Sequence, residues 1–128
     1  MRNVLLATLL ITLPAGAAIA AAPNGAAVFA ANCAACHQAQ GQGIPGAFPT
    51  LARNKFVVGD PKLVAATLLN GRGGMPSFKD GLKDDQLSAV ASFVRSSWGN
   101  KAPAIPPATF AAVRNGSKMV KGKPMPGH

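Results

Sequence analysis

The sequence predicts a small all-α domain with three to four helices. Helical spacing is clearest from Asp84 to Trp98, where apolar residues recur at i, i+3, i+4, i+7 and i+11 starting from Leu87. Capping residues mark two further helices, and the chain shows no alternation of strands and helices. Glycine and proline gather between these stretches, where loops are needed.

The other helices are expected from their end signals. Asn24 is a suitable N-cap for a first helix that runs to Asn32. Asp60 followed by Pro61 opens a second helix, because aspartate caps the free N–H groups and proline fits the first helical position. Residues 70–71, Asn-Gly, end that helix. Residues 102–107 look extended, and residues 108–114 are expected to form a short further helix.

Five consecutive residues, Cys33-Ala34-Ala35-Cys36-His37, form a C-x-x-C-H motif, the pattern of covalent c-type haem attachment. Two thiols at this spacing can add to the two vinyl groups at one edge of a haem and form thioether bonds. The histidine that follows can offer an imidazole nitrogen to the iron. We therefore expect Cys33, Cys36 and His37 to hold one covalently attached haem c.

Other uses of the motif fit the rest of the chain less well. A thioredoxin-like redox pair is expected within a βαβ pattern, which is missing here. A zinc site takes about four nitrogen or sulfur ligands, and the sequence has only one more Cys or His, at His128. A disulfide between Cys33 and Cys36 would close a loop of two residues, which stabilises little.

Two glycine- and proline-rich loops are candidates for completing the haem site. In residues 71–78 Met75 follows Gly-Gly and precedes Pro76, which fixes the backbone, so Met75 is expected to reach the iron as the sixth ligand. A lone methionine is otherwise usually core filler. In residues 38–59 a backbone carbonyl near Pro49 is a candidate acceptor for the other ring nitrogen of His37.

The first 22 residues have the layout of a secretory signal peptide. Met1-Arg2-Asn3 carries a positive charge, an apolar stretch follows from Val4 to Ala20, and small residues end the segment. Cleavage is expected near Ala22, which predicts export to the periplasm. The alternative is a membrane anchor that is retained.

The chain is strongly basic. Thirteen Lys and Arg residues face four Asp and no Glu in 128 residues, for a formal net charge of +9. An exported basic protein meets acidic protein surfaces or anionic lipid, and no recognition motif supports nucleic acid as a partner. Arg72, Lys79 and Lys83 flank Met75, so we expect them around the exposed haem edge, where they would steer an acidic redox partner.

Four segments in order make the chain resemble a small bacterial class I c-type cytochrome: CAACH, FPTL, GGMPSF and a C-terminal helix ending SSWGN. The resemblance implies an all-α class I fold wrapped around one covalently attached haem. It implies His37 and Met75 as proximal and distal iron ligands, with the Pro49 carbonyl holding His37. The expected organisation is a cytochrome c domain over residues 23–100 and an extension over residues 101–128, partly extended or mobile.

The resemblance also implies that the N- and C-terminal helices cross at Gly25, Phe29 and Val94, with Trp98 close by. Two positions depart from the pattern. Relatives often have Gly at the position of Arg53, where a cation would be placed to meet a haem propionate. Relatives often have Ser or Thr at the position of Lys83. Because this chain has neither there, the N-cap is expected at Asp84 instead.

The expected function is a periplasmic one-electron carrier whose haem iron cycles between Fe(II) and Fe(III). It would pass electrons between a dehydrogenase or respiratory complex and an acceptor such as a terminal oxidase. No residue set offers a general base or nucleophile, so an enzyme is not expected. The alternative is a haem-based catalyst or gas sensor in which Met75 is labile. In the tail, Met119, Met125 and His128 are potential copper ligands, with mobile filler as the simpler interpretation.

Overall fold

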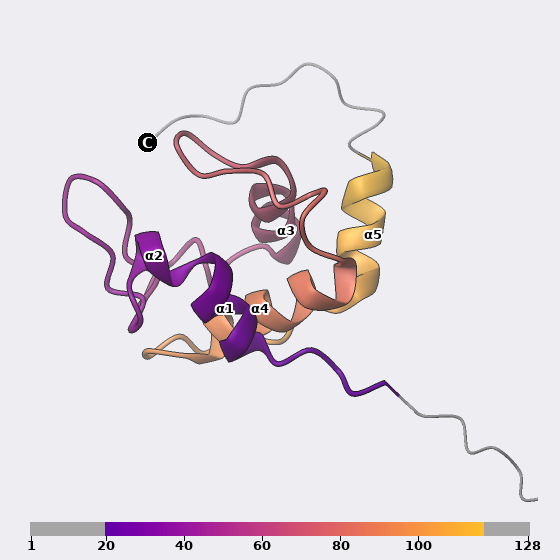
Figure 1. The fold of residues 1–128 in the computed structure, drawn as a ribbon, viewed down its shortest axis with the longest axis horizontal. Helices are drawn as coiled ribbons and strands as arrows, with labels where there is room; N and C mark the ends of the chain where they lie inside the picture. Colours follow the sequence, from indigo (N-terminus) through magenta and orange to yellow (C-terminus); the bar gives the residue numbers. More distant parts are fainter. Residues whose placement is uncertain (1–19, 117–128) are drawn as a thin grey trace, which may run out of the picture.

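The computed structural model describes residues 20–116, and these form five helices and no β-strand (Figure 1). The helices are α1 (Gly25–Asn32), α2 (Ala34–His37), α3 (Pro61–Asn70), α4 (Asp84–Ser96) and α5 (Pro107–Gly116). The predicted all-α class is confirmed, with the haem motif itself as an additional short helix. Most of the expected signal peptide, and the tail with Met119, Met125 and His128, lie outside the described residues.

The predicted caps of the first two expected helices are confirmed. The Asn24 side chain accepts a hydrogen bond from the backbone N–H of Ala27 at 3.1 Å and begins α1. The Asp60 carboxylate accepts from the N–H of Lys62 at 2.8 Å and begins α3. At the end of α3 Gly71 has φ +74°, a left-handed conformation that glycine adopts without steric cost.

The predicted N-cap and C-terminal end of α4 are wrong. Its N-cap is Lys83 rather than Asp84, because Lys83 is extended and its N–H donates to the side chain of Gln86 at 3.0 Å. Asp84 therefore lies inside the first turn, where a carboxylate favours the helix dipole. The helix ends at Ser96, two residues before Trp98, whose φ of +53° lies outside the helical region.

Helices α1 and α4 cross in close contact, as the labels in the lower half of Figure 1 show. A Cβ atom on Gly25 would lie 2.2 Å from the carbonyl oxygen of Ala89 and 2.8 Å from Cβ of Phe93. Beside this contact the rings of Phe29, Phe93 and Trp98 pack with centroids 5.0–5.7 Å apart. The aromatic partner on α4 is thus Phe93, with Trp98 close by as expected, and the contact of Val94 stays a prediction.

The hydrophobic core reaches beyond the boundary that we expected at residue 100. Ile105 and Phe110 are fully buried, and they share one cluster with Leu69 of α3 and Leu87 of α4. Figure 1 shows α5 standing beside α3 and the start of α4. Ile105 and α5 therefore pack into the same core as α3 and α4.

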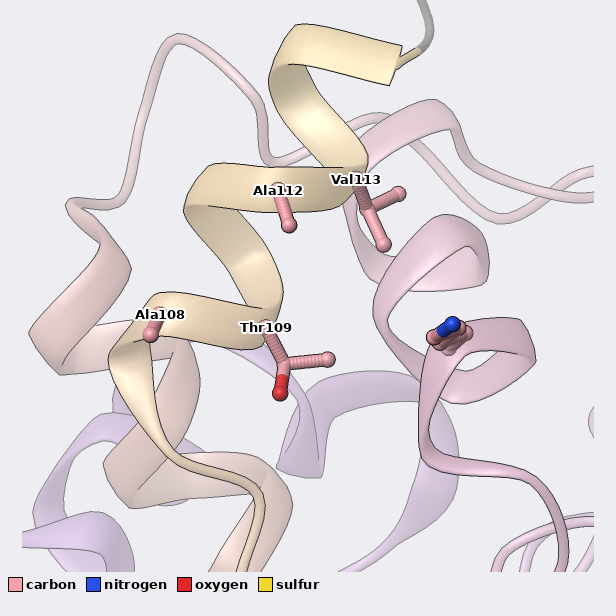
Figure 2. A pocket seen from close by; sticks show the side chains of 5 residues that line it. Ala108, Thr109, Ala112 and Val113 are labelled. Atoms are coloured by element: carbon pink, nitrogen blue, oxygen red, sulfur yellow. The ribbon is translucent and has the colours of Figure 1, made fainter.

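A shallow cleft of about 450 Å³ separates α5 from the start of α3. Figure 2 shows Ala108, Thr109, Ala112 and Val113 of α5 on one side, and Lys62 of α3 also lines it. None of the predicted haem residues lines this cleft, so it is separate from the haem site. Within residues 20–116, no helix is both long and apolar enough to cross a membrane.

Candidate haem site

The C-x-x-C-H motif lies where α1 passes into α2. Cys33 ends α1, its N–H donating to the carbonyl of Phe29 at 2.8 Å, and its own carbonyl accepts from the N–H of His37 at 2.9 Å. Because the motif is a single helical turn, both cysteines and the histidine belong to one rigid unit. The two thiols are half-buried and free, with no disulfide between them.

The structure brings two predicted site residues, His37 and Pro49, into contact. The ring nitrogen Nδ1 of His37 lies 3.0 Å from the carbonyl oxygen of Pro49, and the histidine is only 8% exposed. A carbonyl oxygen can only accept, so Nδ1 is the donor in this contact and Nε2 is the ring nitrogen left for a metal. A metal-ligating histidine typically donates its other ring N–H to such an acceptor, which also fixes the orientation of the ring.

A glycine turn positions the carbonyl of Pro49. Gly43 donates its N–H to the carbonyl of His37 at 2.9 Å and has φ +65°. A Cβ atom there would lie 2.4 Å from the oxygen of Phe48 and 2.7 Å from that of Pro49. Ile44 and Phe48 exchange backbone hydrogen bonds at 2.8 and 2.9 Å and close the turn. Only glycine fits this approach, so the contact depends on Gly43.

Met75 lies on a second closed turn. Arg72 and Met75 exchange backbone hydrogen bonds of 3.2 and 2.9 Å, and a Cβ atom on Gly71 would lie 2.4 Å from the carbonyl oxygen of Met75. Pro76 follows and restricts the backbone. The half-buried Met75 therefore lies on a backbone with little freedom.

Arg72, which we expected at a docking surface, also makes a contact that supports the Met75 turn. Its guanidinium carbon lies 5.1 Å from the centre of the Phe56 ring, a cation–π contact. Arg72 is half-buried, whereas Lys83 is exposed and Lys79 is half-buried. Arg72 thus joins the Met75 turn to the loop before α3.

Asn100 holds the long loop before α3, a role that no sequence signal indicated. Its side chain accepts from the N–H of Asn54 at 3.0 Å, and its amide donates to the carbonyls of Leu51 and Val94 at 2.8 and 2.9 Å. Both the oxygen and the NH2 group of this side chain are therefore hydrogen-bonded, although Asn100 is only 3% exposed. An asparagine after a helix indicates only a helix end, and its partner 46 residues away could not be foreseen.

Arg95 is a second residue whose role sequence reasoning missed. It lies on the buried side of α4, is 3% exposed, and donates to the carbonyls of Pro103, Val57 and Gly59 at 2.8, 2.7 and 3.0 Å. It thereby ties the segments on both sides of α4 together. The sequence signal that could have indicated this role is an arginine among the apolar positions of an amphipathic helix.

Arg53 adopts a backbone conformation that favours glycine. Its φ is +49°, a region that glycine enters more easily than other residues. Its side chain lies against Gly99, where a Cβ atom would be 2.9 Å from its Cγ and Nε atoms. The structure therefore gives Arg53 a packing role in the turn after α4.

The two thiols differ in their surroundings. Burial, and secondarily the repulsion from Cys36, raise the pKa of the Cys33 thiol to about 11. In the haem-free chain this thiol is therefore mostly protonated at neutral pH and weakly nucleophilic.

The donor set fits a covalently attached haem better than a bare metal ion. The motif offers two free thiols and an imidazole whose Nδ1 is hydrogen-bonded to the Pro49 carbonyl. Within residues 20–116, no group of three or more His, Cys, Asp and Glu side chains is arranged to hold a metal ion. Cys33 and Cys36 would form the thioethers, and the haem would supply the one-electron couple.

Comparison with known proteins decides the family. A family model described as "Cytochrome C oxidase, cbb3-type, subunit III" matches residues 20–94. The chain belongs to this cytochrome c family. It is a small class I c-type cytochrome, and it carries covalently bound haem c and transfers electrons.

Several relatives of this cytochrome are similar over most of the domain. Cytochrome c6 of Leptolyngbya boryana is 44% identical over 76 residues, which is 57% of this chain and 88% of that protein. A cytochrome c-552 of Thermus thermophilus is 37% identical over 116 residues, 78% and 74% of the two chains. A crystal structure of cytochrome c6 from the diatom Phaeodactylum tricornutum is 33% identical and covers 58% of this chain and 90% of that one, with a TM-score of 0.49.

A further relative is much larger than this cytochrome. The alcohol dehydrogenase (quinone) cytochrome c subunit of Gluconobacter oxydans is 36% identical over 91 residues, which is 62% of this chain but only 19% of that subunit. The region matched by the family model ends within α4, so α5 lies outside it.

Proposed function

We propose that this cytochrome is a periplasmic one-electron carrier whose iron is held by His37 and Met75. The contact between His37 Nδ1 and the Pro49 oxygen is the observation that supports the proximal ligand, because it orients the ring and leaves Nε2 as the nitrogen for the iron, in the same helical turn as two free thiols. Bound haem supplies an Fe(II)/Fe(III) couple, and the protein contributes position, burial and a docking surface.

The closed turn of residues 71–76 supports Met75 as the distal ligand. Its backbone is fixed by the two hydrogen bonds with Arg72, so a thioether there can be presented in one orientation. Methionine opposite histidine raises the potential of a haem, which suits a carrier. A fixed turn also argues against the alternative of a catalyst or gas sensor, which needs an open or easily vacated sixth position.

The distal assignment is tested with Met75→Ala in the haem-loaded protein. The wild-type ferric protein should show the weak sulfur-to-iron band, and its reduced form should not take up carbon monoxide. Met75→Ala should lose the band and bind carbon monoxide and added imidazole. An unchanged spectrum in the variant contradicts the assignment, and uptake by the wild type favours the alternative function.

Export and partners form the second part of the proposal. The layout of residues 1–22 supports a signal peptide cleaved near Ala22, and hence the periplasm. The family description and the Gluconobacter relative support electron transfer between a dehydrogenase or respiratory complex and an acceptor such as a terminal oxidase, free or as a subunit.

Charge supports an acidic docking partner. No Lys, Arg, Asp or Glu occurs between Arg2 and Arg53, so all basic residues except Arg2 lie from Arg53 onward. The exposed Lys83 and the half-buried Lys79 follow the Met75 turn. Such cations speed the encounter with an acidic surface more than they strengthen the complex.

This steering is measured by oxidising the reduced protein with ferricyanide, an anion, and with a cationic cobalt complex. The ferricyanide rate should fall from low salt towards 0.1 M, where the screening length is about 10 Å, and Lys83→Glu should lower the low-salt rate. The cobalt complex should show the opposite trend. Lys62→Glu makes the same charge change beside the α3–α5 cleft. Equal effects of both variants would contradict a local docking site.

A further inference from the structure

We propose that α5 clamps the segment that follows Met75, and that Arg114 is a positioning residue for the distal ligand. This inference rests on the proposed ligation by Met75. Helix α5 lies outside residues 20–94, the region that the family model matches.

The contacts of Arg114 are concentrated on one short segment. Its Nε and Nη2 atoms donate to one carboxylate oxygen of Asp84 at 3.0 and 2.8 Å. Its Nη1 donates to the carbonyl of Lys79, and Nη2 also reaches the carbonyl of Leu82 at 3.3 Å. One guanidinium therefore joins three points between residues 79 and 84. Its side chain is 24% exposed, so these bonds are partly shielded from water.

Apolar packing supports the same segment from the same side. Leu82 is buried in the cluster that contains Ile105 and Phe110, and Phe78 and Val113 pack against that cluster. The N–H of Leu82 donates to the carbonyl of Phe78 at 3.0 Å, and the N–H of Phe78 donates to the carbonyl of Leu68 at 3.0 Å. Residues 78–82 are thus held between α3 and α5.

This arrangement fixes the far end of the Met75 turn. The near end is closed by Arg72 and Gly71, at the end of α3. Between Met75 and the clamped segment lie only Pro76 and Ser77, and the Ser77 hydroxyl donates to the carbonyl of Leu69. Displacing Met75 therefore requires opening of a segment that Arg114 holds closed.

Competition by added imidazole measures that opening. An external ligand binds only when Met75 has left, so its apparent affinity is proportional to the open fraction. Loss of charge-assisted hydrogen bonds in Arg114→Gln should increase the open fraction. We expect the imidazole affinity of the ferric holoprotein to rise about tenfold. Asp84→Asn, which leaves the two carbonyl contacts, should give a smaller rise, and Arg114→Lys should recover part of the wild-type value.

Hydrogen exchange provides a readout that is independent of the ligand. The amides of Phe78 and Leu82 should exchange about tenfold faster in Arg114→Gln, whereas the Cys33 amide in the α1–α2 unit should be unchanged. Lys62→Gln removes one positive charge from the α3–α5 cleft without touching residues 78–84, and it should alter neither measurement.

The outcomes separate this proposal from the proposed function. If Met75→Ala raises imidazole affinity and Arg114→Gln changes it less than twofold, the clamp is refuted and the distal assignment stands. If Met75→Ala leaves the affinity unchanged, the distal assignment fails and the clamp proposal fails with it. If Arg114→Gln does not accumulate as holoprotein, Asp84→Asn and Arg114→Lys decide by the same criteria.

Discussion

Replacement of Gly25 by alanine tests how closely α1 and α4 cross. The added methyl group would lie 2.2 Å from the carbonyl oxygen of Ala89, 2.8 Å from its carbonyl carbon and 2.8 Å from Cβ of Phe93. Ordinary contact of such atoms begins near 3.4 Å. Two of these atoms are backbone and the third is a Cβ atom, which side-chain rotation does not move, so the helices must separate by roughly 1 Å, given the density of protein interiors.

The cost of this separation follows from the contacts beside it. The rings of Phe29, Phe93 and Trp98, now 5.0–5.7 Å apart, would lose part of their packing. An added methyl group in a packed interface typically costs about 1–3 kcal/mol. The higher helix propensity of alanine returns less than about 1 kcal/mol at a helix end. We expect a net loss of about 2 kcal/mol, or roughly 10 °C in the midpoint of thermal unfolding.

The measurement compares thermal and denaturant unfolding of haem-loaded Gly25→Ala and Gly81→Ala. A Cβ atom on Gly81 meets no atom within 4 Å, and its φ lies outside the left-handed region. This control makes the same chemical change and should alter the free energy of unfolding by less than about 0.5 kcal/mol. Equal stability of the two variants would refute the close crossing of α1 and α4.

Two further predictions concern Cys33 and Arg95. Alkylation of Cys33 in the haem-free chain, followed by peptide mass spectrometry, should accelerate about tenfold per pH unit up to a pKa near 11. Because the fold raises this pKa above 9.0, the protonated Cys33 thiol contributes to stability below pH 9, and that contribution is lost as the pH rises from 9 towards 11. An alkylation rate with its midpoint near pH 9 would show that the haem-free chain does not hold this fold. Arg95→Met leaves three carbonyl oxygens without their donor and should lower the free energy of unfolding by about 3 kcal/mol. Denaturant titration measures this, and a change below about 0.5 kcal/mol would show that water replaces the guanidinium.

Local chemistry allowed much of the molecule to be predicted from its sequence. The caps Asn24 and Asp60 and the stop at Gly71 act within a few residues, and the structure confirms each of them. The C-x-x-C-H motif identified the cofactor, because its spacing serves both vinyl groups of a haem. A hydrogen bond from His37 to a backbone carbonyl near Pro49 was expected, and the structure shows this contact at 3.0 Å.

The errors share one physical cause. The N-cap of α4 at Lys83 and its end at Ser96 depend on the Gln86 side chain and on the left-handed turn at Trp98, which balance several weak local preferences. The position of Phe93 at the helix crossing, which was not predicted, depends on how α4 is rotated about its axis. Packing of the whole domain sets that rotation, and adjacent residues give no direct sign of it.

The sequence by itself determined the all-α class, the haem motif and the candidate ligands, because these depend on residue type and short spacing. Only the tertiary structure decided that α5 belongs to the core and that Arg114 reaches Asp84, 30 residues away. The same holds for Arg95 and Asn100, whose partners lie up to 49 residues away. Such contacts form only when distant segments are packed together, so no local pattern of residues can specify them.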